Sequence, residues 1–449
     1  MEKNKIRSDV RNEFIRIAIP AILENLVGVL ITSIDTKMIA PLGKGAVSAV
    51  SLTAQPKLLF FAIFYALGTA ASIFVAQALG KKDREEANEY FHSVLRICIF
   101  LSLVLGGGLA LLAGPVMRLF SRQKETLALS VTFFRIIMGL MIFQTVSIVL
   151  NAALRGIGQT KVTFISSIFM GAGDILVNYL LIEGHCGFPA LGVAGDALGT
   201  VAGTIAACGV SIFFLRKHSD FLSLKGMLKN RNRQESTMRN IRSKAGNLVF
   251  ENIFTRIGFL ISSLIISGLS ADDTAVYFVA MILLTYSFAF GDGLQNAVVS
   301  LTGRSMGAGN AQEVRAYITE GRKVGVMISV CLSAIYILSA HWYYSLYFSD
   351  AVSIQQGGQY SYVAAVLTLL QIMRIVNIGG MRGMGEVKIP RNLATICVLI
   401  INPGTSFLLT EMLGYGVWGI WISSLVTQII WCLMSFIKLN TCFETRLVS

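Results

Sequence analysis

The sequence predicts an all-α integral membrane protein with twelve transmembrane helices, because of its hydropathy, its length and an internal repeat. Hydrophobic residues make up 54% of the 449 residues, charged residues only 14%, and the mean hydropathy is +0.66. A soluble surface needs more charge, so this composition indicates a bilayer as the solvent. Crossing about 30 Å of hydrocarbon takes roughly 20 helical residues, which leaves room for about a dozen spans. The apolar runs are continuous and not alternating, which excludes a transmembrane β-barrel.

Twelve apolar segments are long enough to cross the membrane as helices. They lie at about 14–39, 46–79, 93–114, 127–150, 162–183, 192–215, 246–268, 274–303, 323–346, 359–381, 389–410 and 416–437. The second and eighth segments are so long that we expect a tilt or a break in each, and Pro56 is a natural break in the second.

The positive charges of the loops predict the orientation of the chain. If the N-terminus lies inside, the loops on that side carry 27 lysines and arginines, and the opposite loops carry four. Because cytoplasmic loops hold the excess of positive charge, we expect a multi-pass protein of the cytoplasmic membrane with both termini in the cytoplasm. The net charge of +13 is then explained by these loops, and we expect no nucleic-acid partner.

A repeat at the scale of half the chain is the most informative feature of the sequence. A shift of 227 residues superposes the segment Arg155-Gly-Ile-Gly-Gln-Thr-Lys161 on Arg382-Gly-Met-Gly-Glu-Val-Lys388. Other pairs at this offset are Glu24-Asn25 with Glu251-Asn252, Leu79-Gly80 with Met306-Gly307, Tyr90 with Tyr317, and Gln144 with Gln371. One constant offset at five places is hard to obtain by chance, so the sequence predicts a duplicated six-helix unit.

The repeat predicts the domain organisation. Residues 1–215 form an N-terminal six-helix lobe, 216–244 a basic cytoplasmic linker, and 245–449 a C-terminal six-helix lobe. Because six is even, both copies keep the same orientation, and such parallel repeats are expected to enclose a central cavity that opens alternately to the two sides. The linker carries nine lysines and arginines, which indicate either a cytoplasmic tether or a binding site for anionic lipid head groups.

Short motifs along the chain resemble one family of membrane transporters. In chain order they are Pro20-Ala-Ile-Leu-Glu-Asn25, Ile34-Asp35-Thr36, Ala76-Gln77-Ala78-Leu79-Gly80, Leu154-Arg155-Gly156-Ile157-Gly158-Gln159-Thr160-Lys161 and Gly192-Val193-Ala194-Gly195. Together they are similar to the MATE (multidrug and toxic compound extrusion) family over nearly the whole chain. The resemblance implies a secondary antiporter that exports organic, often cationic, molecules in exchange for H⁺ or Na⁺.

Asp35, Asp174, Asn178 and Thr200 are the predicted cation site. An ionisable group at bilayer depth costs at least about 2.5–3.5 kcal/mol, so each needs a partner, water or a role. Asp174 and Asn178 lie one helical turn apart, and so do Asp196 and Thr200. Such oxygens suit a hard cation such as Na⁺, and a carboxylate in an apolar cavity can carry a proton instead. The alternative is that these groups only bond one another between helices.

The predicted site resembles the first-lobe cation site of the MATE family, with two differences. The family usually has an asparagine before the aspartate on the fifth helix, whereas here Asp174 precedes Asn178. Asp196 stands where the family usually has a small residue. Lys57 and Lys37 raise a further question, because an ammonium group that neutralised the acids would disfavour Na⁺ coupling and favour proton exchange.

Glu251 matches the acid that the NorM-like branch of the family uses for cation coupling, and Glu24 is its repeat mate. Both are therefore candidates for a coupling or substrate role. The alternatives for Glu251 are that it reaches the cytoplasmic interface or pairs with Arg256. The acid that NorM-like members carry on the tenth helix is not evident, since Gln371 and Arg374 occupy that region.

Other classes of function are less well supported by the sequence. No G-x-x-x-x-G-K-[ST] motif occurs, so ATP is not the direct energy source, and no H-E-x-x-H or G-x-S-x-G motif indicates an enzyme. A lipid-linked saccharide flippase with the same duplicated core is the alternative function, although it would need a basic cavity. We expect a small organic substrate, surrounding lipids, no cofactor beyond the coupling ion, and a monomer.

Overall fold

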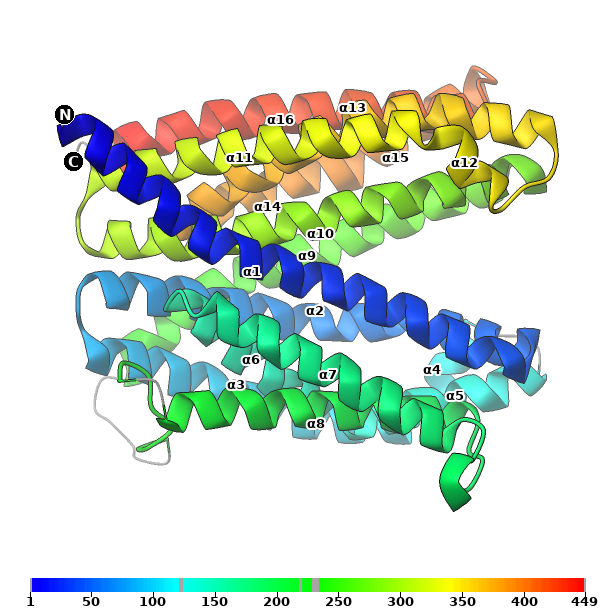
Figure 1. Ribbon diagram of the computed structural model, residues 1–449, viewed down its shortest axis with the longest axis horizontal. Helices are drawn as coiled ribbons and strands as arrows, with labels where there is room; N and C mark the ends of the chain where they lie inside the picture. Colours follow the sequence, from blue (N-terminus) through cyan, green and yellow to red (C-terminus); the bar gives the residue numbers. More distant parts are fainter. Residues whose placement is uncertain (1, 121–123, 218–219, 228–233, 448–449) are drawn as a thin grey trace. The chain divides into compact units, whose positions relative to one another are not determined.

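The computed structural model describes the whole chain except residues 1, 121–123, 218–219, 228–233 and 448–449 (Figure 1). Every regular element in the described part is a helix. Eleven helices in these described residues are long and apolar enough to cross a membrane. Helices α5 (Lys124–Gly139) and α6 (Met141–Gly156) are bent by 51° at Leu140 and form a twelfth span if the pair is counted as one. The predicted all-α membrane fold is therefore confirmed.

The first half of the chain holds eight α-helices in the described residues. Besides α5 and α6 they are α1 (Glu2–Ile39), α2 (Lys44–Gly80), α3 (Arg84–Leu111), α4 (Ala113–Arg118), α7 (Thr160–Leu181) and α8 (Val193–Lys217), with short 3₁₀ turns η1 (Ala40–Leu42) and η2 (His185–Gly187). Pro56 lies inside α2 without ending it. The break falls instead in the fourth span, at Leu140, where hydropathy alone showed one continuous segment.

The second half repeats this order. Its elements are α9 (Gln234–Ser267), α10 (Ala271–Gly307), α11 (Ala311–Leu338), α12 (Ala340–Ser345), α13 (Ala351–Gly383), α14 (Lys388–Ala394), the π-helical turns η3 (Thr395–Ile401) and η4 (Leu408–Met412) on either side of α15 (Asn402–Phe407), and α16 (Val417–Leu447). Both ends of α2, α3 and α4 lie 227 residues before the ends of α10, α11 and α12. The predicted repeat is thus present in the helix boundaries.

The turn after α2 shows that the repeat extends to local chemistry. The Asp83 carboxylate accepts a hydrogen bond from the Glu86 N–H and so caps α3, and the Asn310 side chain caps α11 through the Glu313 N–H. The residue before each cap has a positive φ, 58° at Lys82 and 70° at Gly309. Only the second copy has the glycine that adopts this conformation without strain. The two copies therefore make the same turn from different residues.

The chain forms two compact units whose boundaries fall inside helices. One, called here the first-lobe unit, is Leu23–Val249, and the second-lobe unit is Met1–Ile22 together with Phe250–Ser449. Helix α9 begins at Gln234, within the segment 216–244 that was predicted as the linker. A polar helical turn outside the membrane gives no hydropathy signal, which is why the sequence assigned 234–244 to the linker.

Specific contacts explain why the helix ends belong to these units. In the second-lobe unit, Glu13 on α1 forms an ion pair of 2.8 Å with Arg304 and accepts a hydrogen bond from the Tyr317 hydroxyl. In the first-lobe unit, the Asn240 side chain on α9 donates to the Tyr90 hydroxyl at 3.0 Å. Tyr90 and Tyr317 are repeat mates, and so are Glu13 and Asn240. In each half of the chain, the beginning of the first helix thus packs in the unit formed mainly by the other half. This exchange of helix ends follows the same repeat.

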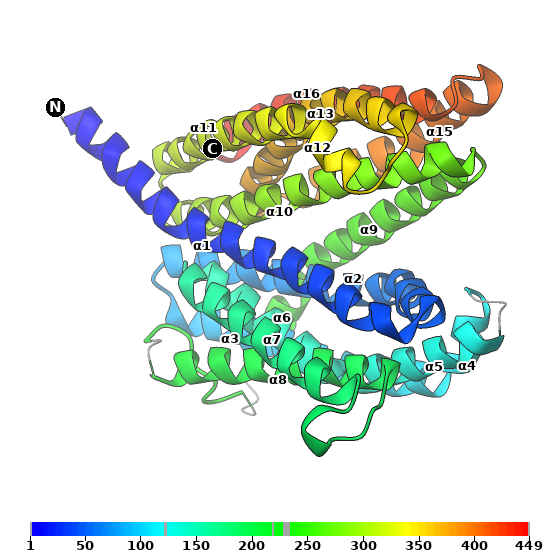
Figure 2. The same cartoon turned by 45° about the vertical axis from the view of Figure 1, so that its right-hand side comes forward.

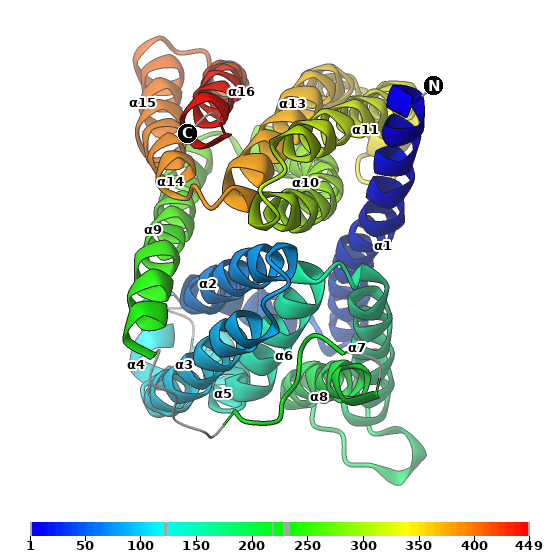
Figure 3. The same ribbon diagram turned by 90° about the vertical axis from the view of Figure 1, so that its left-hand side faces the viewer.

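Each unit packs its own helices around a core. Within the first-lobe unit, α7 and α8 lie side by side (Figure 1), and α2 packs on α3 and α6. The loop with η2 extends beyond the ends of α7 and α8 (Figure 2). Within the second-lobe unit, α10, α11 and α13 pack together (Figure 3). Its core includes the buried ring of Trp421, whose centroid lies 5.1 Å from that of Tyr277 and 5.3 Å from that of Tyr360.

Candidate functional site

Three residues of the predicted cation site meet in the first-lobe unit. The Asn178 amide on α7 donates to the Asp174 carboxylate at 3.0 Å and to the Asp35 carboxylate of α1 at 3.3 Å. Asp174 is 4% exposed, Asn178 is fully buried, and Asp35 is half-buried. One amide group therefore holds two carboxylates from different helices together. Asp196 at the start of α8 is also buried, and its charge interacts with that of Asp35.

Two buried oxygen atoms of this cluster have no hydrogen-bond partner among the described residues. They are Oδ1 of Asn178 and Oδ1 of Asp196. A buried oxygen without a partner costs about 1–3 kcal/mol, so it either stores strain or accepts a ligand. The described residues contain no group of three His, Cys, Asp or Glu side chains arranged to hold a metal ion. A bound cation would therefore depend on amide and hydroxyl oxygens as well as carboxylates, and the assignment of Na⁺ stays a prediction.

Glycines on α8 allow the close approach that forms the cluster. A methyl group on Gly199 would lie 2.0 Å from Oδ1 of Asn178, and one on Gly203 would lie 3.0 Å from Cβ of Asp174. Gly195, Gly199 and Gly203 follow one another at intervals of four residues, so they form one stripe of α8. Small residues in such a stripe let two membrane helices pack backbone to backbone. The position of Asn178 thus depends on the absence of a side chain at Gly199.

Replacing Gly199 with alanine is expected to displace Asn178 and to lower the stability of the folded protein. The added methyl group overpacks the interface between α7 and α8, which typically costs about 1–3 kcal/mol. Thermal unfolding of the purified protein measures the effect. Gly209→Ala is the matched control on the same helix, because nothing lies within 4 Å of a methyl group there. An equal change in both variants would show that the contact with Asn178 does not matter.

Lys57 on α2 is the positive group of this cluster. Its charge interacts with those of Asp35, Asp174 and Asp196, although no described carboxylate lies within ion-pair distance of it. Its ammonium group lies 6.0 Å from the ring centroid of Phe133. Lys37, by contrast, is exposed. Lys57 and Lys37 were both candidates to neutralise the acids. Only Lys57 interacts with the three aspartates among the described residues.

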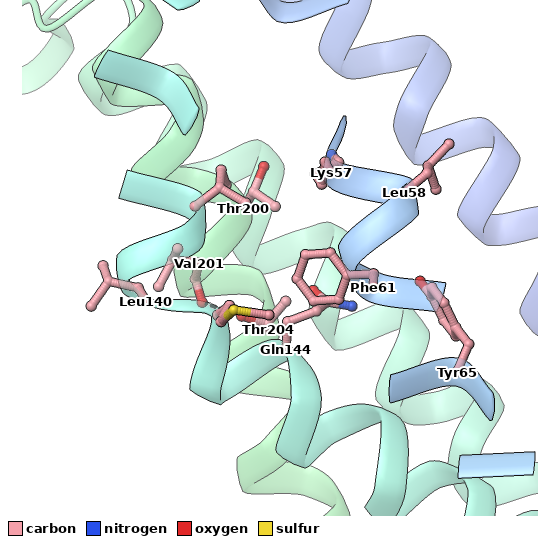
Figure 4. A pocket seen from close by; sticks show the side chains of 11 residues that line it. Lys57, Leu58, Phe61, Tyr65, Leu140, Gln144, Thr200, Val201 and Thr204 are labelled. Atoms are coloured by element: carbon pink, nitrogen blue, oxygen red, sulfur yellow. Dashed lines mark hydrogen bonds between the residues drawn. The ribbon is translucent and has the colours of Figure 1, made fainter. Parts of the chain in front are cut away.

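A cavity of about 100 Å³ begins beside Lys57 and continues along α2 (Figure 4). The α2 side chains Lys57, Phe61 and Tyr65 line one side of it, and residues of α5, α6 and α8 line the other. The complete lining is Lys57, Leu58, Phe61, Tyr65, Ile137, Leu140, Met141, Gln144, Thr200, Val201 and Thr204. Thr200, the fourth predicted site residue, therefore lines this cavity. Among the described residues, Thr200 forms no hydrogen bond with the carboxylates of the cluster.

The two predicted glutamates each have an arginine partner. Glu24 forms an ion pair of 2.6 Å with Arg155 and accepts a hydrogen bond of 2.5 Å from Thr163. Glu251 forms an ion pair of 2.9 Å with Arg382. These pairs are repeat mates at the offset of 227, so one buried interaction occurs in both halves of the chain. The partner of Glu251 is Arg382 and not Arg256.

The structure thus separates the predicted site residues into two groups. Asp35, Asp174 and Asn178 share one hydrogen-bond network, whereas Glu24 lies about 16 Å from Asp35 along α1, at about 1.5 Å per residue. The coupling roles of Glu24 and Glu251 stay predictions. Arg374 is buried in the second-lobe unit, where its Nε donates to Gln428 at 3.1 Å and its guanidinium lies 3.7 Å from the centre of a Trp431 ring.

Sequence comparison places the chain among known transporters. The MatE family model matches it twice, over residues 20–180 and 248–408, which again reflects the repeat. A "Probable multidrug resistance protein NorM" of Thermotoga maritima is 23% identical over 418 residues, which is 92% of this chain and 89% of that protein. An "Uncharacterized transporter YisQ" of Bacillus subtilis is also 23% identical, over 91% of this chain and 90% of its own length.

Solved structures share the fold. A MOP superfamily transporter from Pyrococcus furiosus, described as having a binding pocket of reverse polarity, superposes with a TM-score of 0.89 at 18% identity. The match covers 97% of this chain and 96% of that one. An outward-facing multidrug resistance MATE family transporter also reaches 0.89, at 17% identity, over 98% and 97% of the two chains.

Proposed function

Because this chain belongs to the MatE family of membrane transporters, we propose that it exports organic, drug-like molecules, chiefly cations, in exchange for H⁺ or Na⁺. The observation that carries the proposal is the cluster of buried Asp174 and Asp196 with half-buried Asp35, beside Lys57. The names of NorM relatives, which refer to multidrug resistance, support the substrate class. On this proposal the protein lies in the cytoplasmic membrane with both termini inside.

The charges of the cluster suggest how exchange would work. Three ionised carboxylates and one ammonium group leave two negative charges, which are costly inside a membrane. A coupling cation that neutralises one of them is displaced when a cationic substrate offers its own charge. Because the two occupants compete for the same carboxylates, export of one drives uptake of the other.

We propose that the proton is the preferred coupling ion. Lys57 already offsets part of the negative charge of the acids. A proton needs only one carboxylate oxygen, whereas Na⁺ needs several oxygen ligands that are not shared with an ammonium group. The experiment uses purified protein in liposomes loaded with a fluorescent organic cation, with a pH gradient and a Na⁺ gradient imposed separately. Efflux under the pH gradient alone is the expected result. The contrary result is that neither gradient drives efflux while the protein moves a lipid-linked saccharide across the bilayer. That result would identify the protein as a flippase.

Replacing Lys57 with methionine is expected to make transport respond to Na⁺. The substitution keeps the length of the side chain and removes its charge, so the cluster gains one net negative charge and binds a metal cation more tightly. The same liposomes under a Na⁺ gradient measure this. Lys37→Met is the matched control, since Lys37 is exposed and has no place in the cluster. An unchanged ion dependence in Lys57→Met would separate the lysine from the coupling step.

The flippase alternative is not favoured. A site for a lipid-linked pyrophosphate needs several basic groups that converge on its phosphates. The cavity of Figure 4 has one basic residue in its lining, Lys57, and lies next to three acids.

A further inference from the structure

A basic groove lies at one end of the first-lobe unit, at the opposite ends of the helices from Asp35. It consists of two adjoining cavities of about 570 and 530 Å³. Arg84 at the start of α3, Ser223 and Lys225 line both cavities. Arg216 at the end of α8 lines the first cavity, and Arg96 on α3 lines the second. These residues come from three separate parts of the chain.

The segment after α8 is held against α3 by specific hydrogen bonds. The Asn88 amide donates to the Phe221 carbonyl at 2.9 Å and accepts from the Ser223 N–H at 2.7 Å. The His92 ring lies 2.6 Å from the Ser223 carbonyl. These three hydrogen bonds to the backbone of residues 221–223 fix the path of this segment along α3. These hydrogen bonds therefore determine the position of Lys225 in the same cavity linings as Arg84.

The groove carries an excess of positive charge that no described carboxylate pairs. Arg84, Arg96, Arg216 and Lys225 are opposed by two acids of the lining, Glu85 and Glu89. Glu89 accepts a hydrogen bond of 2.5 Å from Thr237, and none of the four basic groups forms an ion pair with a carboxylate in the described residues. Four cations at one site with their charges unpaired attract an anion that offers several oxygen acceptors.

Apolar surface adjoins the groove on the same helices. Phe213 lies one turn before Arg216 on α8 and is 53% exposed, and Phe100 lies one turn after Arg96 on α3 and is 66% exposed. In a membrane-spanning chain such side chains face acyl chains. A ligand with a charged head and an apolar tail would satisfy both surfaces at once.

The residues that clamp the segment after α8 are not repeated at the equivalent positions of the second half. The repeat mates of Arg84, Asn88 and His92 are Ala311, Arg315 and Thr319. General attraction of positive loops to a membrane would act on both halves. Arg315 and Thr319 stand where Asn88 and His92 form the clamp, so the clamp itself belongs to the first-lobe unit.

We propose that the basic groove binds the phosphate head group of an anionic membrane lipid. Arg84, Arg96, Arg216 and Lys225 contact the phosphate oxygens, and Phe213 and Phe100 contact the acyl chains. The bound lipid bridges the end of α8 to α3. This site is separate from the acid cluster, so its occupancy does not depend on which ion drives transport.

The test measures retention of phosphatidylglycerol on the purified protein by native mass spectrometry, with phosphatidylcholine of the same acyl chains as competitor. Each basic side chain near a membrane surface contributes about fivefold to binding of an anionic lipid. Arg84→Gln combined with Lys225→Gln is therefore expected to lower retention about thirtyfold. Lys388→Gln with Lys438→Gln removes two exposed positive charges from the second-lobe unit and is the matched control. Equal losses in both double variants would overturn the proposal.

A third variant distinguishes a built site from diffuse charge. Asn88→Ala changes no charge but releases residues 221–223 from α3, so retention is expected to fall at least as much as on loss of one basic side chain, about fivefold. Unchanged retention in Asn88→Ala would overturn the proposal. Inorganic phosphate is added in a separate arm. If millimolar phosphate displaces the lipid completely, the site is one for a soluble anion and the assignment to a lipid is wrong.

Discussion

Replacing Asp174 with asparagine is expected to abolish coupled export and to leave the protein folded. Asp174 is 4% exposed and shares the Asn178 amide with Asp35, so its charge acts on whatever occupies the cluster. A hydrogen bond to a charged group contributes about 1.5–3 kcal/mol, which corresponds to a loss of roughly tenfold to a hundredfold in ion affinity. Transport falls at least as far, because an antiporter that cannot hold its ion cannot complete the exchange.

Folding survives this substitution for a physical reason. Asparagine has almost the same volume as aspartate, so it opens no cavity, and it removes one of the negative charges that oppose burial in the cluster. The assay is efflux from liposomes under a pH gradient, with thermal unfolding of the same preparation. Asp35→Asn is expected to behave alike. Glu183→Gln, an exposed acid after α7, is the control that removes a charge outside the cluster. Wild-type efflux in folded Asp174→Asn would exclude the cluster from the mechanism.

Replacing Arg382 with methionine is expected to destabilise the protein strongly. Arg382 and Glu251 are both largely buried, and their ion pair measures 2.9 Å. Removing one partner of a buried pair typically costs about 3–5 kcal/mol, because the other charge is left without compensation. Arg382 also donates to Gln295 at 2.6 Å, so a second hydrogen bond is lost with it. Chemical or thermal unfolding in detergent measures the difference.

The repeat supplies the controls for this prediction. Arg155→Met breaks the equivalent pair with Glu24 and is expected to have an effect of similar size, since that pair measures 2.6 Å. The double variant Glu251→Gln with Arg382→Met removes both charges and is expected to recover most of the lost stability. If the double variant regains both stability and transport, the role of Glu251 is structural. If it regains stability but not transport, Glu251 takes part in ion coupling. Wild-type stability in Arg382→Met would show that the pair contributes nothing.

The spans could be predicted from the sequence because hydropathy and repetition are both local signals. Each of the twelve predicted segments corresponds to one of the eleven candidate spans or to the bent pair α5 and α6. The bend at Leu140 could not be predicted, since no proline marks it and its repeat mate lies inside the unbroken α13. The start of α9 at Gln234 was missed because polar residues outside a membrane form helices without any apolar pattern.

The candidate site could be predicted only where spacing within one helix determined it. Asp174 and Asn178 are one turn apart on α7, and the resemblance to a family added Asp35 from α1. The pairing of Glu251 with Arg382 joins two helices far apart in the chain, and spacing along a helix says nothing about which helices touch. The Asn88 clamp was likewise invisible, because it binds backbone groups whose course no side-chain pattern encodes.

The exchange of helix ends has a consequence for how the protein is made. The unit boundaries at Ile22 and Val249 are themselves 227 residues apart, so each half contributes the beginning of its first helix to the other unit. In the present chain, residues up to Ile22 leave the ribosome first yet belong to the unit that is synthesised last. Neither unit is therefore complete until the chain has passed the middle, and the second waits for both ends.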